Sequence, residues 1–124
     1  MNEDTYLKKL LSTTPHKQEA LSWLQQKDGK ERLIGESNQD MDAPTSLRFV
    51  QDLYQQGATE VTAIDVDADT HLETTNTLIV KLPQEALKRK KVFQSEAKIA
   101  RRGGFGAVAD EGQEYLMLHC KEAP

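Results

Sequence analysis

The sequence contains a single cysteine, Cys120, and no apolar run long enough to cross a bilayer. One cysteine excludes an internal disulfide and a metal cluster built from several cysteines. A transmembrane helix needs roughly 20 consecutive apolar residues, and the start of the chain, Met1 to Asp4, is acidic where a secretory signal would be basic and then apolar. We therefore expect a cytoplasmic protein in a reducing compartment that does not engage a membrane.

Repeats and low-complexity tracts are also absent from the 124 residues. A chain of this length buries roughly two-thirds of the surface that it exposes when unfolded, which is enough for a hydrophobic core. We therefore expect residues 1–124 to form one domain.

Charge is distributed unevenly along the chain. The formal net charge is −4, but residues 1–80 carry a net charge of −7, residues 81–102 a net charge of +6 and residues 103–124 a net charge of −3. Such asymmetry affects which partners are attracted, and it does not determine the fold.

Two helices are predicted at the N-terminus. Leucines recur at helical spacing in residues 4–11, and Thr14-Pro15 has the pattern of an N-cap followed by proline at the first helical position. The second helix is expected to end near Lys27, before a turn. Residues 1–28 are therefore predicted to form a helical hairpin.

The rest of the chain alternates between strand and helix patterns. Strands are predicted at residues 32–36, 61–66, 77–82 and 115–120, and helices at residues 45–56 and 84–102. The second and third strands are expected to pair as a hairpin around a polar loop. Residues 31–121 then have the order βαββαβ, which predicts an α+β fold with a ferredoxin-like antiparallel sheet.

In a ferredoxin-like sheet the strand order is 4-1-3-2, so the third strand is central. Leu78-Ile79-Val80 is apolar on both faces, as a central strand requires. Both later helices are expected on one face of the sheet. Because the last strand is also apolar on both faces, the N-terminal hairpin or a second copy of the chain must cover the other face. A homodimer through the sheet is therefore one expectation.

Asp65, Asp67 and Asp69 alternate as at the start of a calcium-binding loop. The rest of that loop does not match, because Thr70 stands where the sharp turn needs glycine and Asn76 where a bidentate glutamate is needed. We therefore predict a solvated hairpin tip and no metal site.

The glycine-rich segment of residues 102–108 partly matches the basic-Gly-aromatic motif of RNA-recognition sheets. It has an extra glycine, Ala107 replaces an aromatic residue, and the segment follows a helix instead of lying on the third strand. A phosphate-binding loop fits less well, because Gly-x-Gly-x-x-Gly is absent. We predict a helix-to-strand connection.

No catalytic residue and no cofactor is predicted. His119 and Cys120 are sequence neighbours, so on a strand they point to opposite faces and cannot form a nucleophile–base pair. We expect both of them to be buried core residues.

The helix of residues 84–102 stands out by its charge. Lys88, Lys91, Lys98 and Arg102 fall on the arc opposite its apolar stripe when 100° is advanced per residue, whereas Arg89 lies nearer the buried side. Like charges on one helix face repel, so we expect compensation by acidic N-terminal residues or by an acidic protein partner. We name the four residues of this arc as the predicted partner-binding residues.

Residues 46–82 resemble a pattern of small bacterial proteins of unknown function. The pattern is a helix from Arg48 to Gln56, followed by Gly57-Ala58 and by two strands. It covers about a third of the chain, and it implies no activity, ligand or functional residue.

These observations favour a non-enzymatic binding or regulatory module that engages a protein partner, or itself, through its sheet or its basic helix. One alternative is a nucleic-acid-binding protein that uses the helix of residues 88–102, although the overall acidity argues against it. A small-ligand-binding or enzymatic domain with an unidentified substrate is the other alternative.

Millimolar calcium is expected to leave the melting temperature of the protein unchanged, because the loop of residues 65–73 lacks the glycine and glutamate of a calcium site. A ligand that binds only the native state raises the melting temperature by mass action. A saturable rise in a thermal scan with added calcium would contradict this prediction.

Overall fold

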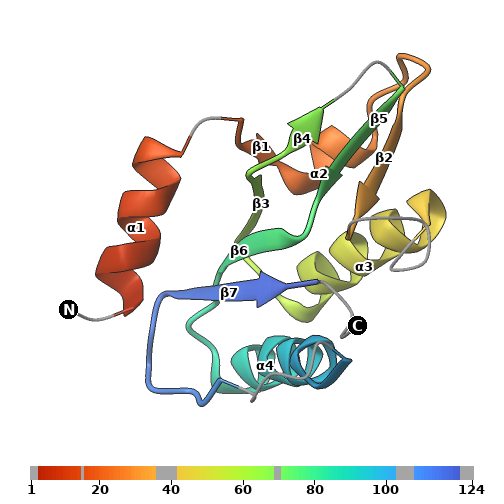
Figure 1. Ribbon diagram of the computed structural model, residues 1–124. Coiled ribbons are helices and arrows are strands. Elements are labelled where there is room, and N and C mark those ends of the chain that lie inside the picture. The colour runs from red at the N-terminus through yellow and green to blue at the C-terminus, as the bar shows by residue number, and fades with distance from the viewer. Residues whose placement is uncertain (1–2, 15, 36–41, 69–70, 103–107, 121–124) are drawn as a thin grey trace.

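The computed structural model describes residues 3–14, 16–35, 42–68, 71–102 and 108–120 (Figure 1). The helices are α1 (Glu3–Thr13), α2 (Ala20–Leu24), α3 (Ala43–Gln56) and α4 (Ala86–Arg102). The strands are β1 (Gln18–Glu19), β2 (Glu31–Ile34), β3 (Glu60–Ile64), β4 (Asp67–Ala68), β5 (Leu72–Thr75), β6 (Thr77–Lys81) and β7 (Tyr115–His119). The predicted α+β class is confirmed. Within these ranges, no helix combines the length and the apolar character needed to cross a membrane.

The larger sheet has four antiparallel strands in the order β1-β3-β6-β7. The predicted pairing of the strands at residues 61–66 and 77–82 is confirmed, and β6 is an internal strand, as its apolar faces predicted. However, β7 pairs directly with β6. It occupies the position that a ferredoxin-like order gives to the first strand.

The strand that contains Leu33 and Ile34 lies outside the four-stranded sheet, so the predicted ferredoxin-like arrangement was wrong on this point. Instead, β2 pairs in parallel with β5, and β4 completes a second sheet in the order β2-β5-β4. The register places Arg32 directly opposite Glu73. In this position the cationic side chain of Arg32 finds a carboxylate, which a buried arginine requires.

The polar loop predicted between the strands at residues 61–66 and 77–82 was wrong in part, because this segment contains two strands, β4 and β5, that continue the ribbon of β3 and β6. The first sheet pairs Ile64 with Thr77, and the second pairs Asp67 with Thr74. Both chain segments advance by three residues between these two pairs, so the pairing register of the ribbon is the same in both sheets. Between them Asp65 has a left-handed φ of 52°, and the hydroxyl of the buried Thr75 donates a hydrogen bond to the Ile64 carbonyl. The ribbon therefore bends here from the first sheet into the second.

The first predicted helix is confirmed as α1, but the second was wrong in its start and length. Residues 18–19 pair with β3, and α2 begins only at Ala20, capped by the Glu19 carboxylate, which accepts hydrogen bonds from the backbone N–H groups of Leu21 and Ser22. The same carboxylate accepts a hydrogen bond from the Tyr54 hydroxyl at 2.5 Å. These bonds hold residues 18–19 extended along β3. The predicted proline at the helix start, residue 15, lies outside the described residues.

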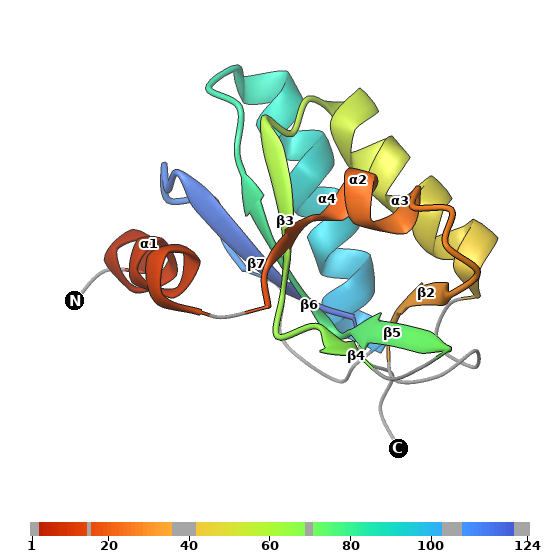
Figure 2. The same cartoon turned by 90° about the horizontal axis from the view of Figure 1, so that it is seen from above.

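Helices cover both faces of the four-stranded sheet (Figure 2). On one face the alternate residues of β3, β6 and β7 pack with α2, α3 and α4, which confirms the common face predicted for the last two helices. On the other face Leu7 of α1 packs against Ile64 and Ile79. The predicted N-terminal hairpin is therefore not formed, because α1 covers this face and α2 packs on the opposite one.

Gly57 ends α3 in the left-handed conformation, with a φ of 116°. A Cβ atom at this position would meet the Cδ and Cβ atoms of Lys88 in α4 at 2.8 and 2.9 Å. The absence of a side chain therefore lets the end of α3 approach the start of α4.

Gly57→Ala is expected to destabilise the protein more than Gly29→Ala. Gly29 is also left-handed, with a φ of 85°, but a Cβ atom there would meet nothing within 4 Å. Both substitutions carry strain of about 1–2 kcal/mol, and at Gly57 the overlap with Lys88 adds about 1–3 kcal/mol. Urea unfolding of both variants measures the difference, and equal losses of stability would contradict the close approach.

Candidate functional site

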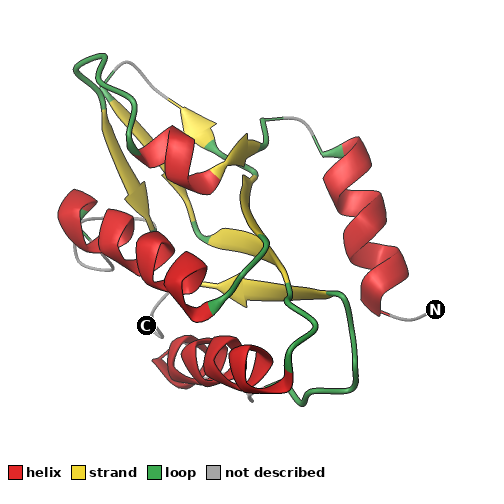
Figure 3. Cartoon of the chain, turned by 180° about the vertical axis from the view of Figure 1, so that it is seen from behind, coloured by secondary structure: helices red, strands yellow, loops and turns green. Residues whose placement is uncertain are grey.

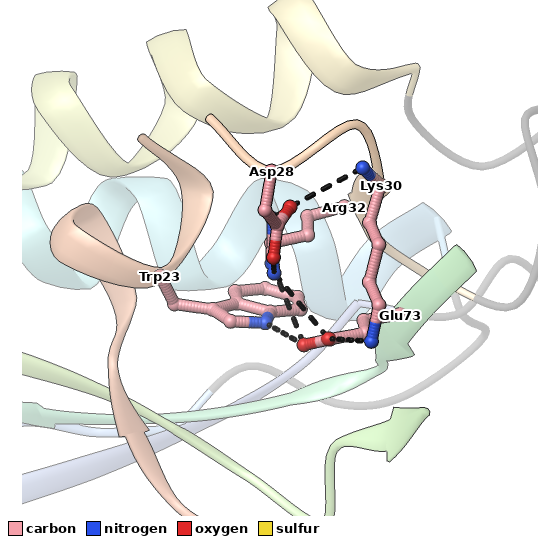
Figure 4. A network of polar contacts seen from close by, with 5 residues as sticks. All are labelled: Trp23, Asp28, Lys30, Arg32 and Glu73. Atoms are coloured by element: carbon pink, nitrogen blue, oxygen red, sulfur yellow. Dashed lines mark hydrogen bonds and ion pairs between the residues drawn. The ribbon is translucent and has the colours of Figure 1, made fainter. Parts of the chain in front are cut away.

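A group of paired charged side chains lies where the second sheet meets α2 (Figure 4). The guanidinium of Arg32, whose side chain is 3% exposed, donates two hydrogen bonds of 2.7 Å to the Asp28 carboxylate and lies 3.4 Å from the Glu73 carboxylate. Glu73 also accepts hydrogen bonds from the Trp23 indole N–H at 2.9 Å and from the Lys30 ammonium at 3.2 Å. This group is called the Arg32 network below.

The Arg32 network is internally paired. Burial disfavours the ionised form of Glu73, but hydrogen bonds from Trp23 and Lys30 and the charge of Arg32 outweigh it and lower the pKa of Glu73 below 4.5. The hydrogen bonds from Arg32 lower the pKa of Asp28 well below its ordinary value. Among the described residues, every buried side-chain nitrogen and oxygen has a hydrogen-bond partner. The network therefore holds elements of the fold together and does not resemble a site awaiting a ligand.

A groove of about 320 Å³ lies between α3 and α4, which are adjacent on the same face of the sheet (Figure 3). The helices run in opposite directions, since Gly57 at the end of α3 lies beside Lys88 at the start of α4. The lining residues are Thr45, Phe49, Asp52 and Gln56 from α3 and Ser95, Lys98 and Ile99 from α4. We call this feature the α3–α4 groove.

The α3–α4 groove has an apolar part and charged walls. Phe49 is half-buried and Ile99 is buried, so the two provide apolar surface within the groove. The hydroxyl of Ser95 donates a hydrogen bond of 2.8 Å to the side-chain carbonyl of Gln56 and ties the two walls together. The groove is therefore built on two packed helices, which makes its shape well defined.

Of the predicted partner-binding residues, Lys98 belongs to the α4 wall of this groove, and Lys88 and Lys91 lie on the same helix. Lys88, Lys91 and Lys98 are exposed, and Lys98 lines the groove directly. At 100° per residue, they share one arc of α4 with the lining residues Ser95 and Ile99. We call the three lysines the lysine arc.

The fourth predicted residue, Arg102, is the last residue of α4, and its side chain lies outside the described side chains. Lys88 forms an ion pair of 3.5 Å with Glu85. The structure describes no ion pair for Lys91 or Lys98.

Arg89 lies nearer the buried side of α4, as predicted. Its guanidinium forms an ion pair of 2.6 Å with Asp110 and donates a hydrogen bond to the Pro83 carbonyl. The hydrogen bond from Arg89 lowers the pKa of Asp110. Arg89 is therefore used to attach the start of α4 to the segment before β7, and it does not belong to the lysine arc.

The predicted compensation by acidic N-terminal residues is not supported by the position of α1. This helix packs on the opposite face of the sheet from α4 (Figure 2). There the Asp4 carboxylate accepts hydrogen bonds of 2.9–3.0 Å from the backbone N–H groups of Glu114 and Tyr115. Asp4 therefore attaches α1 to the start of β7.

The remaining sequence candidates do not come together as a site. Cys120 is buried, as expected, whereas His119 is exposed, so the prediction of a buried His119 was wrong. His119 is the last residue of β7, at the rim of the sheet face that α1 covers. Asp65 and Asp67 are exposed, and the residues that the structure describes contain no group of three or more His, Cys, Asp or Glu placed to hold a metal ion. Asp69 and residues 103–107 of the glycine-rich segment lie outside the residues that the structure describes.

Comparison of the chain with protein-family models, curated proteins and solved structures returned no match. The resemblance noted for residues 46–82 therefore stays a prediction.

Sequence reasoning missed the α3 wall of the groove. Thr45, Phe49, Asp52 and Gln56 recur every three or four residues along one side of α3, at the border of its apolar stripe. This spacing is visible in the sequence. The proximity of α3 to α4, which makes it a wall, is visible only in the structure.

Glu73→Gln is expected to lower the stability of the protein at neutral pH and to make the stability less sensitive to acid pH. Because the folded pKa of Glu73 is depressed, its ionised form stabilises the fold above the ordinary pKa of 4.5, and this stabilisation is lost as the pH falls through the folded pKa. Loss of the charged acceptor costs about 1–3 kcal/mol at pH 7.

Urea unfolding of wild type and variant between about pH 7 and pH 3 measures this effect. Glu31→Gln, an exposed glutamate on the same strand as Arg32, is the matched control and should behave as wild type. Asp28 still titrates in Glu73→Gln, so the pH dependence of the stability of this variant becomes shallower without vanishing. Parallel curves for Glu73→Gln and wild type would contradict the prediction.

Proposed function

We propose that the protein is a non-enzymatic binding module that holds an acidic segment of a partner protein against the lysine arc and the α3–α4 groove. The observation that carries this proposal is the placement of Lys91 and Lys98 on the same arc of α4 as the groove residues Ser95 and Ile99. Both lysines are exposed, and neither has an ion-pair partner among the described residues.

Charge alone would give little affinity, because an exposed ion pair contributes about 0–1 kcal/mol. The apolar surface of Phe49 and Ile99 supplies the second contribution, since fully burying an apolar side chain of the partner gains about 1.5–3 kcal/mol. Several ion pairs and one or two buried side chains together support a reversible interaction of a regulatory kind.

A protein partner accounts for the site better than nucleic acid does. The lysine arc would suit phosphates, but a nucleic acid carries them along its whole length and so also beside Asp52 on the α3 wall, whereas a peptide can confine its acidic residues to the side of the lysine arc. The formal net charge of −4 also opposes a long polyanion more than it opposes a short acidic segment.

The test uses a fluorescein-labelled amphipathic peptide of about four helical turns, with apolar residues at helical spacing, glutamate on one flank and glutamine on the other. We expect fluorescence anisotropy to show binding that weakens as the salt concentration rises toward 1 M, where the Debye length shrinks to about 3 Å. Lys91→Gln combined with Lys98→Gln should weaken binding by about two- to tenfold and leave stability unchanged, because these lysines have no ion-pair partner among the described residues.

Lys9→Gln combined with Lys27→Gln is the matched control, because it removes two exposed lysines elsewhere on the chain. The proposal is rejected if both double variants bind as wild type does, or if single-stranded DNA of equal charge binds more tightly than the peptide. Chemical-shift changes on α3 and α4 in a titration followed by NMR would localise the peptide to the groove.

A further inference from the structure

We infer that the segment bound in the α3–α4 groove is an amphipathic helix with acidic residues on one flank and basic residues on the other, and that Asp52 selects for the basic flank. This inference rests on the proposed function and adds the shape and charge pattern of the partner. It concerns a residue, Asp52, that the lysine arc does not include.

The two walls of the groove carry opposite charges. Asp52 lines the groove from α3, and Lys98 lines it from α4. The structure describes no ion pair for either of them, although both side chains are exposed beside the same groove. A ligand that satisfies both walls must therefore present a cation to α3 and an anion to α4.

The α3 wall of the groove is long enough to hold a short helix. Thr45, Phe49, Asp52 and Gln56 follow one side of α3 from the first to the last of 12 residues, a distance of about 16 Å or about three helical turns. Recognition in a groove between helices uses apolar anchors at positions i, i+3 or i+4, and i+7 of the bound helix. Such anchors would lie over Phe49 and Ile99, and the flanking residues would then face Asp52 on one side and Lys98 on the other.

Asp52 also accounts for selectivity against uniformly acidic ligands. A phosphate chain or a helix with acidic residues on both flanks would place negative charge beside Asp52, and like charges in contact lower affinity. A helix with one basic flank avoids this repulsion in one of its two directions along the groove. Asp52 is therefore a residue that determines specificity.

The experiment compares two peptides of equal length with identical apolar anchors. One carries glutamate on both flanks, and the other carries glutamate on one flank and lysine on the other. Their affinities are measured by fluorescence anisotropy for wild type, for Asp52→Asn and for Asp67→Asn, an exposed aspartate on β4 that serves as the control. Wild type should prefer the mixed peptide, and Asp52→Asn should reduce the ratio of the two affinities by about two- to fivefold, the range of one exposed ion pair.

The outcomes separate this inference from the proposed function. If both peptides bind to the groove and Asp52→Asn leaves the ratio unchanged, the selective role of Asp52 is wrong and the proposed function stands. If neither peptide binds, both the inference and the proposed function fail. A reduced ratio in Asp52→Asn together with an unchanged ratio in Asp67→Asn supports the inference.

A third peptide tests the helical form of the ligand. Proline in the middle of the mixed peptide prevents a continuous helix and costs at least about 3 kcal/mol in a helical conformation, which corresponds to more than a hundredfold in affinity. We expect binding to wild type to be lost. Equal binding of the proline peptide and the mixed peptide would show that the ligand binds in an extended form, which overturns the helical part of the inference.

Discussion

The burial of the Arg32 guanidinium is the constraint on which the arrangement of the rest of the structure depends. A buried cation requires a paired anion, and breaking a buried pair costs about 3–5 kcal/mol. Arg32 meets this requirement with Asp28, at 2.7 Å, and with Glu73, which it faces at 3.4 Å across the parallel strands β2 and β5. A shift of one residue in this register would turn the side chain to the other face of the sheet. The contact with Glu73 thereby helps to hold β2 on β5, outside the four-stranded sheet.

The position of β2 in turn fixes α3. The backbone N–H of Ile34, the last residue of β2, donates a hydrogen bond of 2.9 Å to the buried hydroxyl of Ser46 in the first turn of α3. The other end of α3 is fixed by Gly57, which allows Lys88 of α4 to approach. Because both ends of α3 are held, its polar side lies along α4 and forms a groove of defined shape. The Arg32 network therefore supports the candidate binding site without contacting a ligand.

The charge distribution separates side chains that are paired within the fold from those that the proposed function uses. Arg89 is paired with Asp110, and Arg32 is paired with Asp28 and Glu73. Both arginines therefore attach elements of the fold to one another. Lys91 and Lys98 are exposed, and the structure describes no ion pair for them. This division explains why removing the lysines should change binding and leave folding intact, whereas removing Glu73 should change stability.

Local patterns in the sequence determined those helices and strands whose conformation depends mainly on residues close to one another in the chain. Helical spacing predicted α1, α3 and α4, and apolar segments predicted β3, β6 and β7 together with the internal position of β6. The exposed lysine arc also followed from helical spacing alone. Only the tertiary structure decided where β2 pairs, that Gln18–Glu19 extend along β3, and that Asp52 and Lys98 line the same groove. These features depend on Arg32 with Glu73, on Glu19 with Tyr54 and on the packing of α3 against α4, which are contacts between residues far apart in the chain that no local pattern encodes.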